Sequence, residues 1–480
     1  MYSFLAVHGV KFLEAQVTAR RNQWGLVVAA GLATFLAQLD TTIVTVALPY
    51  LAEDLQAEVG TTQWVMLAYL VPVIALSLTS GQWVDRIGPG AALAVAVATF
   101  AVLSVAASAA PTVGLLVAAR AGQGLAGALL LAAAPALAVA SVARPVRGRA
   151  LAVVATLAPL GGMSGPALGG ILVGQYGSRA IFLVGVPVAA LILGLLRGHA
   201  APRGPVPRLE RRGLLGIALL GGAALTCLLA LTPRDGGALT RWWLLPLGVA
   251  LVLLWWRVGG ASGLSTVLAL PAMRTVHSAY VAVYLAVLAV QFLVPFFLGR
   301  QLSAAPGTIG MVMIAFPLTA ALAGPVSGWA ADRWSARAVA AAGATLLTVA
   351  LAAFAPLSVR WEAGTVAVLL AMVGVGFGLF LTANQALALA VVPDSRLGLA
   401  TASTNLARVV GLAAGPAVAT ATWAATGYAI SGMRLALVIA AAASGAAALA
   451  LVLARVPGGL QQSSVRDRGP APSSNPARSS

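Results

Sequence analysis

Residues 39–49 read Leu39-Asp40-Thr41-Thr42-Ile43-Val44-Thr45-Val46-Ala47-Leu48-Pro49, a stretch that sets a carboxylate inside a hydrophobic run beginning at Trp24. About 20 apolar residues are enough to cross a bilayer as a helix. An ionised Asp at mid-membrane depth costs about 2.5–3.5 kcal/mol on insertion scales, so it is retained where it faces a cavity, a partner or a substrate. By our assignment of the spans, Asp40 is the only one of 12 acidic residues within the membrane. It is the first candidate functional residue.

The composition predicts a helical membrane protein. Of 480 residues, 60% are hydrophobic and 9% are charged, and mean hydropathy is +0.96, whereas a soluble domain needs about a quarter of charged residues. The runs repeat at helix length without the alternation of a membrane barrel. The net charge of +17 comes from arginines in short loops, which set membrane topology rather than bind nucleic acid.

Several function classes find no support in the sequence. The single cysteine, Cys227, permits no intrachain disulfide and no thiolate metal site. No nucleotide-binding loop and no catalytic serine elbow occur, so an ATP-driven pump or an enzyme is not expected. We predict no metal and no cofactor.

Fourteen spans are expected, as an all-α bundle. They lie at about 24–48, 62–82, 91–110, 112–142, 150–174, 180–197, 213–232, 241–257, 276–299, 307–330, 337–356, 364–392, 400–424 and 434–455. With a cytoplasmic N-terminus, the inside segments hold 21 Lys and Arg residues and the outside loops hold 6. This bias supports the number of spans and predicts that both termini are cytoplasmic. No cleaved signal peptide is predicted.

Two motifs recur at nearly one offset. Gly-x-x-x-Asp-Arg begins at Gly81 and again at Gly328, and Gly-x-x-x-Gly-Pro begins at Gly161 and again at Gly411. These repeats predict two homologous six-helix halves, with an inserted helix pair and a site between the halves. The expected division is 1–23 N-terminal segment, 24–200 first bundle, 201–212 linker, 213–258 inserted pair, 259–456 second bundle and 457–480 disordered tail.

These residues resemble the 14-spanner drug:proton antiporter family of the major facilitator superfamily over essentially the whole chain. Residues 39–49 look like its first-span motif, with Thr45 where Asn is usual. Gly81–Gly88 resembles the loop motif after span two, Arg120–Gly124 the span-four motif, and Gly161–Gly170 the antiporter motif of span five. Ser178–Leu183 is a degraded form of the aromatic segment that follows. The resemblance implies exchange of a proton for an exported substrate.

Asp40 is the candidate proton carrier, because burial disfavours the charged form of a carboxylate. The alternative is an Asp that only packs helices through a hydrogen bond to Thr41 or the backbone. Arg120 is its candidate partner, since a guanidinium stays charged and can hold a carboxylate ionised. The alternatives are that Arg120 snorkels to the surface or joins spans four and one.

The remaining candidates are residues of a substrate cavity and of a conformational gate. The expected cavity residues are Thr41, Gln123, Trp64, Tyr69, Gln291, Asn384 and Gln385, with Asn405 and Arg408 as similar candidates. The expected gate residues are Gly81, Asp85, Arg86, Gly161, Gly165, Pro166, Gly169, Gly328, Asp332, Arg333, Gly411, Gly415 and Pro416. Glycines four residues apart let helices approach closely, and proline loosens a helix, which suits a rocking contact between halves. The alternative for the polar cavity residues is ordinary helix packing. For Trp64 and Tyr69 it is a place in the aromatic belt at the membrane interface.

The leading hypothesis is a monomeric, proton-coupled exporter of lipophilic neutral or monocationic compounds, such as antibiotics, in a bacterial cell membrane. One buried carboxylate does not comfortably serve a proton and several cationic charges. Its expected partners are a small amphipathic substrate, protons and lipid, and no nucleic acid. Export of one specific metabolite on the same fold is the second hypothesis. A non-transporting membrane scaffold is the third, although a scaffold needs neither Asp40 nor the repeated motifs.

Overall fold

A computed structural model describes residues 23–77, 79–143, 146–201, 211–233, 241–259, 262–392 and 397–453. Within these ranges the regular structure is helical. The elements are α2 (Trp24–Asp54), α3 (Val59–Thr62), α4 (Trp64–Leu76), α5 (Ser80–Ile87), α6 (Pro89–Ser108), α7 (Val113–Ala140), α8 (Arg147–Tyr176), η2 (Ser178–Leu183), α9 (Gly185–Leu195), α10 (Arg211–Ala230), α11 (Leu244–Arg257), α12 (Ser262–Leu268), α13 (Pro271–Phe296), η3 (Phe297–Gln301), α14 (Pro306–Arg333), α15 (Ala336–Phe354), α16 (Ala363–Ala390), α17 (Leu397–Ala424) and α18 (Ile430–Leu453).

The described helices agree with a bundle of 14 spans. Thirteen helical segments are long and apolar enough to cross a membrane, and two of them join consecutive elements: Val59–Leu76 (α3 with α4) and Ser178–Leu195 (η2 with α9). Helix α11, with 14 residues, is apolar but shorter. The predicted second span, 62–82, is divided between α3, α4 and the start of α5. The predicted span at 241–257 begins as a helix only at Leu244. Residues 1–22 of the predicted N-terminal segment (1–23), the predicted tail 457–480 and most of the linker lie outside the described residues.

Local sequence explains where the helices begin and turn. Prolines occupy the first turn of α6, α13 and α14, where a missing backbone N–H costs nothing. The hydroxyl of Thr112 accepts a hydrogen bond from the Leu115 backbone N–H and caps α7. Gly88 joins α5 to α6 at a φ of 90°, a conformation that side chains rarely tolerate.

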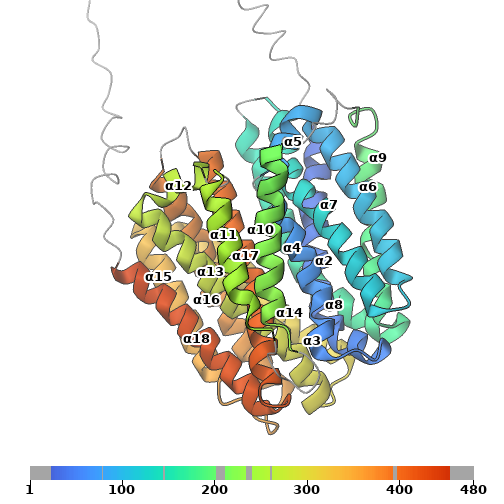
Figure 1. Ribbon diagram of the computed structural model, residues 1–480, viewed down its shortest axis with the longest axis vertical. Coiled ribbons are helices and arrows are strands. Elements are labelled where there is room, and N and C mark those ends of the chain that lie inside the picture. The colour runs from blue at the N-terminus through green and yellow to red at the C-terminus, as the bar shows by residue number, and fades with distance from the viewer. Residues whose placement is uncertain are drawn as a thin grey trace, which may run out of the picture.

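The helices form two neighbouring bundles (Figure 1). In one, α2 packs on α8, and α7 packs on α4 and α6; in the other, α13 packs on α17, and α16 packs on α14 and α15. The pairs α2–α8 and α13–α17 are equivalent in the predicted repeat. Helices α10 and α11 lie in front of the bundles in this view, and α10 contacts α4. The exact domain boundaries remain a prediction.

The bundles touch most closely where α8 meets α14. A Cβ on Gly170 would lie 2.7 Å from the Pro306 carbonyl oxygen and 3.0 Å from the Gly310 Cα. A Cβ on Gly310 would lie 2.6 Å from the Pro166 carbonyl oxygen. The backbones are therefore in contact, which only glycine allows. By the predicted topology, this contact closes the outer side of the protein.

Candidate functional site

A buried ion pair joins the two residues that the sequence singled out. Arg120 on α7 donates from Nη1 to both carboxylate oxygens of Asp40 on α2, at 2.9 Å to Oδ1 and 2.7 Å to Oδ2. The Arg120 side chain is 1% exposed and that of Asp40 is 8% exposed. In the described part of the chain this is the one salt bridge. The structure therefore does not show Arg120 snorkelling; it joins span four to span one through Asp40.

Neutral groups surround the Arg120 guanidinium. Its Nε donates to the Val65 carbonyl oxygen at 2.9 Å, and its Nη1 also donates to Gln123 Oε1 at 2.8 Å. Gln123 in turn donates to Ser104 Oγ at 2.8 Å. Hydrogen bonds on several sides fix the guanidinium even when its carboxylate partner changes.

The ring of Tyr69 on α4 completes this arrangement. Its centroid lies 4.9 Å from the Arg120 Cζ, within the range of a cation–π contact. Side chains at Gly124 and Gly127 would collide with Tyr69, so the small residues of α7 make room for it. Phe182 of η2 lies on another side of the guanidinium, at 5.9 Å.

A cavity of about 780 Å³ lies between the two bundles. Four helices of each bundle line it: α2, α4, α7 and α8, and α13, α14, α16 and α17. On α2 the lining residues recur every three or four positions, which places them on one helix face: Thr34, Ala37, Gln38, Thr41, Thr42 and Thr45. The cavity size is that of a drug-sized small-molecule site.

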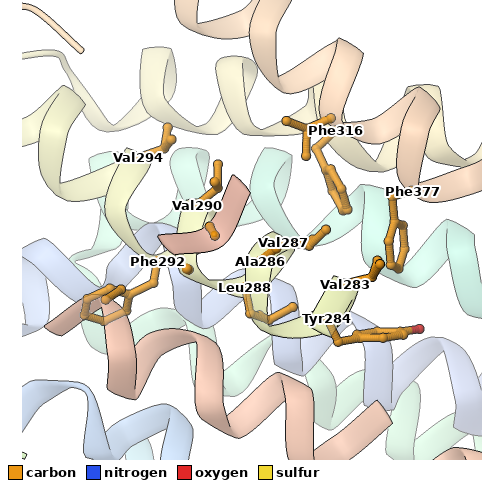
Figure 2. Close-up of a cluster of buried hydrophobic side chains, with 14 of the residues drawn as sticks. Val283, Tyr284, Ala286, Val287, Leu288, Val290, Phe292, Val294, Phe316 and Phe377 are labelled. Atoms are coloured by element: carbon orange, nitrogen blue, oxygen red, sulfur yellow. The ribbon is translucent and has the colours of Figure 1, made fainter. Parts of the chain in front are cut away.

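Aromatic side chains form the wall on the second bundle. The rings of Tyr284 and Phe377 have centroids 5.2 Å apart and are nearly perpendicular, at 87°. Phe316 lies 5.5 Å from Phe377. Figure 2 shows these three side chains gathered at one end of the α13 cluster, with Phe316 and Phe377 coming from other helices. All three line the cavity.

Tyr69 and Thr41 are the link between the cavity and the ion pair. Both line the cavity, whereas Asp40, Arg120 and Gln123 do not. Tyr69 faces the cavity and also stacks on Arg120, so one side chain separates a bound substrate from the buried charges.

Among the other predicted cavity residues, Gln291 and the further candidate Arg408 line the cavity, whereas Asn405 does not. Trp64 instead donates from Nε1 to Thr232 Oγ1 at 3.0 Å, which attaches it to the second residue after α10. Asn384 is fully buried and donates to the Val276 carbonyl oxygen at 3.4 Å. Gln385 accepts a hydrogen bond of 2.8 Å from the Tyr280 hydroxyl. These three side chains make contacts between helices and are not among the residues that line this cavity.

The predicted glycine motif of α8 has a different contact from the one expected. Side chains at Gly161 and Gly165 would collide with Phe35 and Thr42 of α2, so these glycines pack two helices of the same bundle. A Cβ on Gly169 would lie 3.1 Å from the Ile43 side chain. The contact between bundles is made by the neighbouring Gly170, with Pro166 beside it. Of the predicted residues on α8, Pro166 therefore lies at the contact between bundles, whereas Gly161, Gly165 and Gly169 face α2.

The repeated motif in α17 does the same work in the second bundle. A Cβ on Gly411 would lie 2.6 Å from the Val281 carbonyl oxygen, and one on Gly415 would lie 2.7 Å from that of Leu285. Both glycines therefore pack α17 on α13. Pro416, the next residue, lies inside α17.

The predicted gate charges are exposed in this conformation. Asp85, Arg86, Asp332 and Arg333 all lie at the surface, and none of them takes part in a salt bridge within the described ranges. A Cβ on Gly81 would meet nothing within 4 Å, and one on Gly328 would only touch Thr382 at 4.0 Å. Their expected action as a latch on the inner side stays a prediction.

From the sequence, Arg408 was only a further candidate for the cavity, with no separate role predicted for its charge. Arg408 of α17 lines it, as do the aromatic residues of the second bundle. The available signal was that Arg408 lies well inside a span. The aromatic residues gave none, because a cavity wall and a packed core use the same residue types.

Comparison with known proteins agrees with this architecture. The family model of the Major Facilitator Superfamily matches residues 30–210 and 276–478. The Riboflavin transporter RibZ of Clostridioides difficile is 26% identical over 385 residues, which are 79% of this chain and 83% of that protein. The Multidrug resistance protein Stp of Mycobacterium tuberculosis (strain CDC 1551 / Oshkosh) is 28% identical over 412 residues, 83% of this chain and 75% of that protein.

A solved structure shows the same fold. The bacterial homologue of the human lysosomal transporter Spinster, in an inward-facing and unoccupied conformation, is similar with a TM-score of 0.66 at 16% identity. The similarity covers 90% of this chain and 98% of that chain. The protein is thus a multi-pass bacterial membrane transporter. The chain belongs to the Major Facilitator Superfamily.

Proposed function

We propose that this protein exports amphipathic compounds from the bacterial cytoplasm in exchange for protons, by alternating access, with both termini cytoplasmic. The observation that carries the proposal is the buried Asp40–Arg120 pair, one side chain away from a drug-sized cavity. Intramembrane carboxylates are costly, and their usual use in transporters is to relay protons.

The coupling follows from the partners of Asp40. Its carboxylate takes either the Arg120 guanidinium or a proton as the neutralising group, because a buried charge needs one of them. When a proton binds to Asp40, Arg120 keeps its hydrogen bonds to the neutral acceptors Val65 and Gln123. It loses its electrostatic attraction to the carboxylate on α2. Protonation therefore loosens α7 from α2. Tyr69 carries that change to the cavity wall.

The switch between the two faces uses the contact of α8 with α14. The glycine backbones at Gly170 and Gly310 touch without interlocking side chains, so one bundle can rock on the other. The exposed Asp85-Arg86 and Asp332-Arg333 segments are then free to engage when the inner side closes. This keeps the predicted gate role for both motifs.

The relatives support two substrate readings. The multidrug resistance protein supports a broad range of lipophilic compounds, and the mostly apolar cavity wall fits that reading. The riboflavin transporter supports a single multi-ring metabolite. The threonines and glutamines on α2 and α13 offer hydrogen bonds to such a molecule. We favour the broader reading, because the first bundle supplies mainly short hydroxyl side chains and little shape-specific polar contact.

The test is proton-driven transport of a panel of dyes and antibiotics into inverted vesicles, with Asp40→Asn as the variant. We expect normal expression, loss of gradient-driven transport and retained exchange of labelled for unlabelled substrate, because exchange needs no proton. Glu362→Gln, an exposed carboxylate-to-amide change before α16, is the matched control. Undiminished proton-driven transport by Asp40→Asn would refute the coupling role.

A further inference from the structure

Arg408 puts a positive charge on the wall of the central cavity. It lies on α17, and Val409 and Leu412 of the same helix line the cavity beside it. It is the only Lys, Arg, Asp, Glu or His among the described residues that line the cavity. Asp40 and Arg120 neutralise each other behind the wall. The net charge that a substrate meets is therefore positive.

The partners of Arg408 are neutral. Its Nε and Nη2 donate to Asn405 Oδ1 at 3.2 and 2.6 Å. Its Cζ lies 6.0 Å from the centroid of the Tyr284 ring. No carboxylate of the described chain is within ion-pair distance of it. An amide and a phenol orient the guanidinium, but they leave its charge uncompensated.

Arg408 lies too deep in the membrane for its side chain to extend easily to the membrane surface. Residue 408 is eleven positions from the first residue of α17, or roughly 16 Å at the helical rise of about 1.5 Å per residue. That is about half of the hydrocarbon thickness of about 30 Å. A cationic side chain at this depth faces a water-filled cavity or a counter-charge, since it cannot deprotonate.

We propose that Arg408 is the receptor for an acidic group of the substrate, so that the cavity selects aromatic compounds with one negative charge. This inference rests on the proposed transport function and narrows its substrate class. A carboxylate or phenolate supplies the counter-charge that Arg408 lacks, through a charge-assisted hydrogen bond. Arg408 would repel a monocationic substrate. We therefore exclude monocationic compounds, which the sequence had suggested together with neutral ones.

The aromatic rings beside Arg408 indicate the apolar part of the ligand. Tyr284 contacts Arg408 on one side and stands edge-on to Phe377 on the other. Phe316 extends this wall, at 5.5 Å from Phe377. An aromatic scaffold resting on these rings directs an acidic substituent at Arg408. Aromatic walls with one charged group are the usual way in which a mostly apolar pocket fixes the orientation of a ligand.

The test is equilibrium binding to the purified full-length protein in detergent, with three dansyl probes that share one aromatic scaffold and differ in the terminal group that sets their charge. Dansylglycine is anionic, dansylglycinamide is neutral and dansylethylenediamine is cationic. We expect the native protein to bind the anion at least tenfold more tightly than the amide and to bind the amine most weakly. Arg408→Gln should remove the preference, and Arg408→Lys should keep part of it.

Two controls separate the outcomes. Arg360→Gln changes an exposed arginine outside the cavity and should leave the preference intact. The Lys variant keeps the positive charge, so it tests the role of the charge independently of whether the Gln variant folds. Equal binding of the three probes by the native protein, no binding of the anion, or an unchanged preference in Arg408→Gln would each overturn the inference. Loss of proton-driven transport in Asp40→Asn bears only on coupling, because this binding assay needs no gradient.

Discussion

The sharpest prediction concerns the asymmetry of the buried ion pair. Asp40→Asn keeps the shape of the side chain and removes its charge, which leaves the Arg120 guanidinium 1% exposed with only neutral acceptors. Arg120→Gln instead leaves a carboxylic acid, which can become neutral by binding a proton, whereas a guanidinium cannot lose its charge. Removing the acid should therefore cost more stability than removing the base.

The magnitude follows from the burial of both partners. Breaking a buried pair by removing one partner costs about 3–5 kcal/mol, and water screens neither group here, so we expect that cost for Asp40→Asn. At the unfolding entropy of globular proteins, 480 residues give about 1 kcal/mol per degree. The thermal midpoint should fall by roughly 3–5 °C. The double variant Asp40→Asn with Arg120→Gln should be more stable than the single variant Asp40→Asn, because no charge is left buried.

The assay is thermal unfolding of the four purified proteins in one detergent, followed by circular dichroism of the helices. A midpoint for Asp40→Asn equal to that of the native protein would refute the reasoning. So would a larger fall for Arg120→Gln than for Asp40→Asn, or additive costs in the double variant. Additive costs would mean that the two groups do not interact across α2 and α7.

Two further predictions test the bundle contact and the inserted helices. Gly170→Val should lower transport strongly while the protein still accumulates, because its Cβ meets the Gly310 backbone at 3.0 Å; Gly174→Val, whose Cβ would meet only a side-chain carbon at 3.9 Å, should transport normally in the same vesicles. Trp64→Phe should lower the thermal midpoint by about 1 °C, since it loses one hydrogen bond to Thr232 worth about 1 kcal/mol. The same variant should keep native affinity for substrate, and weakened binding would restore Trp64 to the cavity.

Much of the architecture was readable from the sequence because a membrane constrains the chain strongly. Backbone polar groups in lipid must be paired within each helix, so hydrophobic length alone predicted the helices. The Asp40–Arg120 pair was predictable for a related reason. An arginine and an aspartate buried in apolar spans both need partners, and the sequence offered very few.

The sequence by itself thus determined the helical membrane fold and predicted the repeat and the two charged residues of the buried pair. Only the tertiary structure decided which helix faces look into the cavity. It placed Trp64, Asn384 and Gln385 in packing contacts, and it placed Arg408 on the cavity wall. It also showed that Gly170 contacts the other bundle, whereas the predicted Gly169 contacts α2. The physical reason is that hydropathy fixes which residues enter the membrane, whereas the rotation of each helix depends on side-chain packing against all of its neighbours.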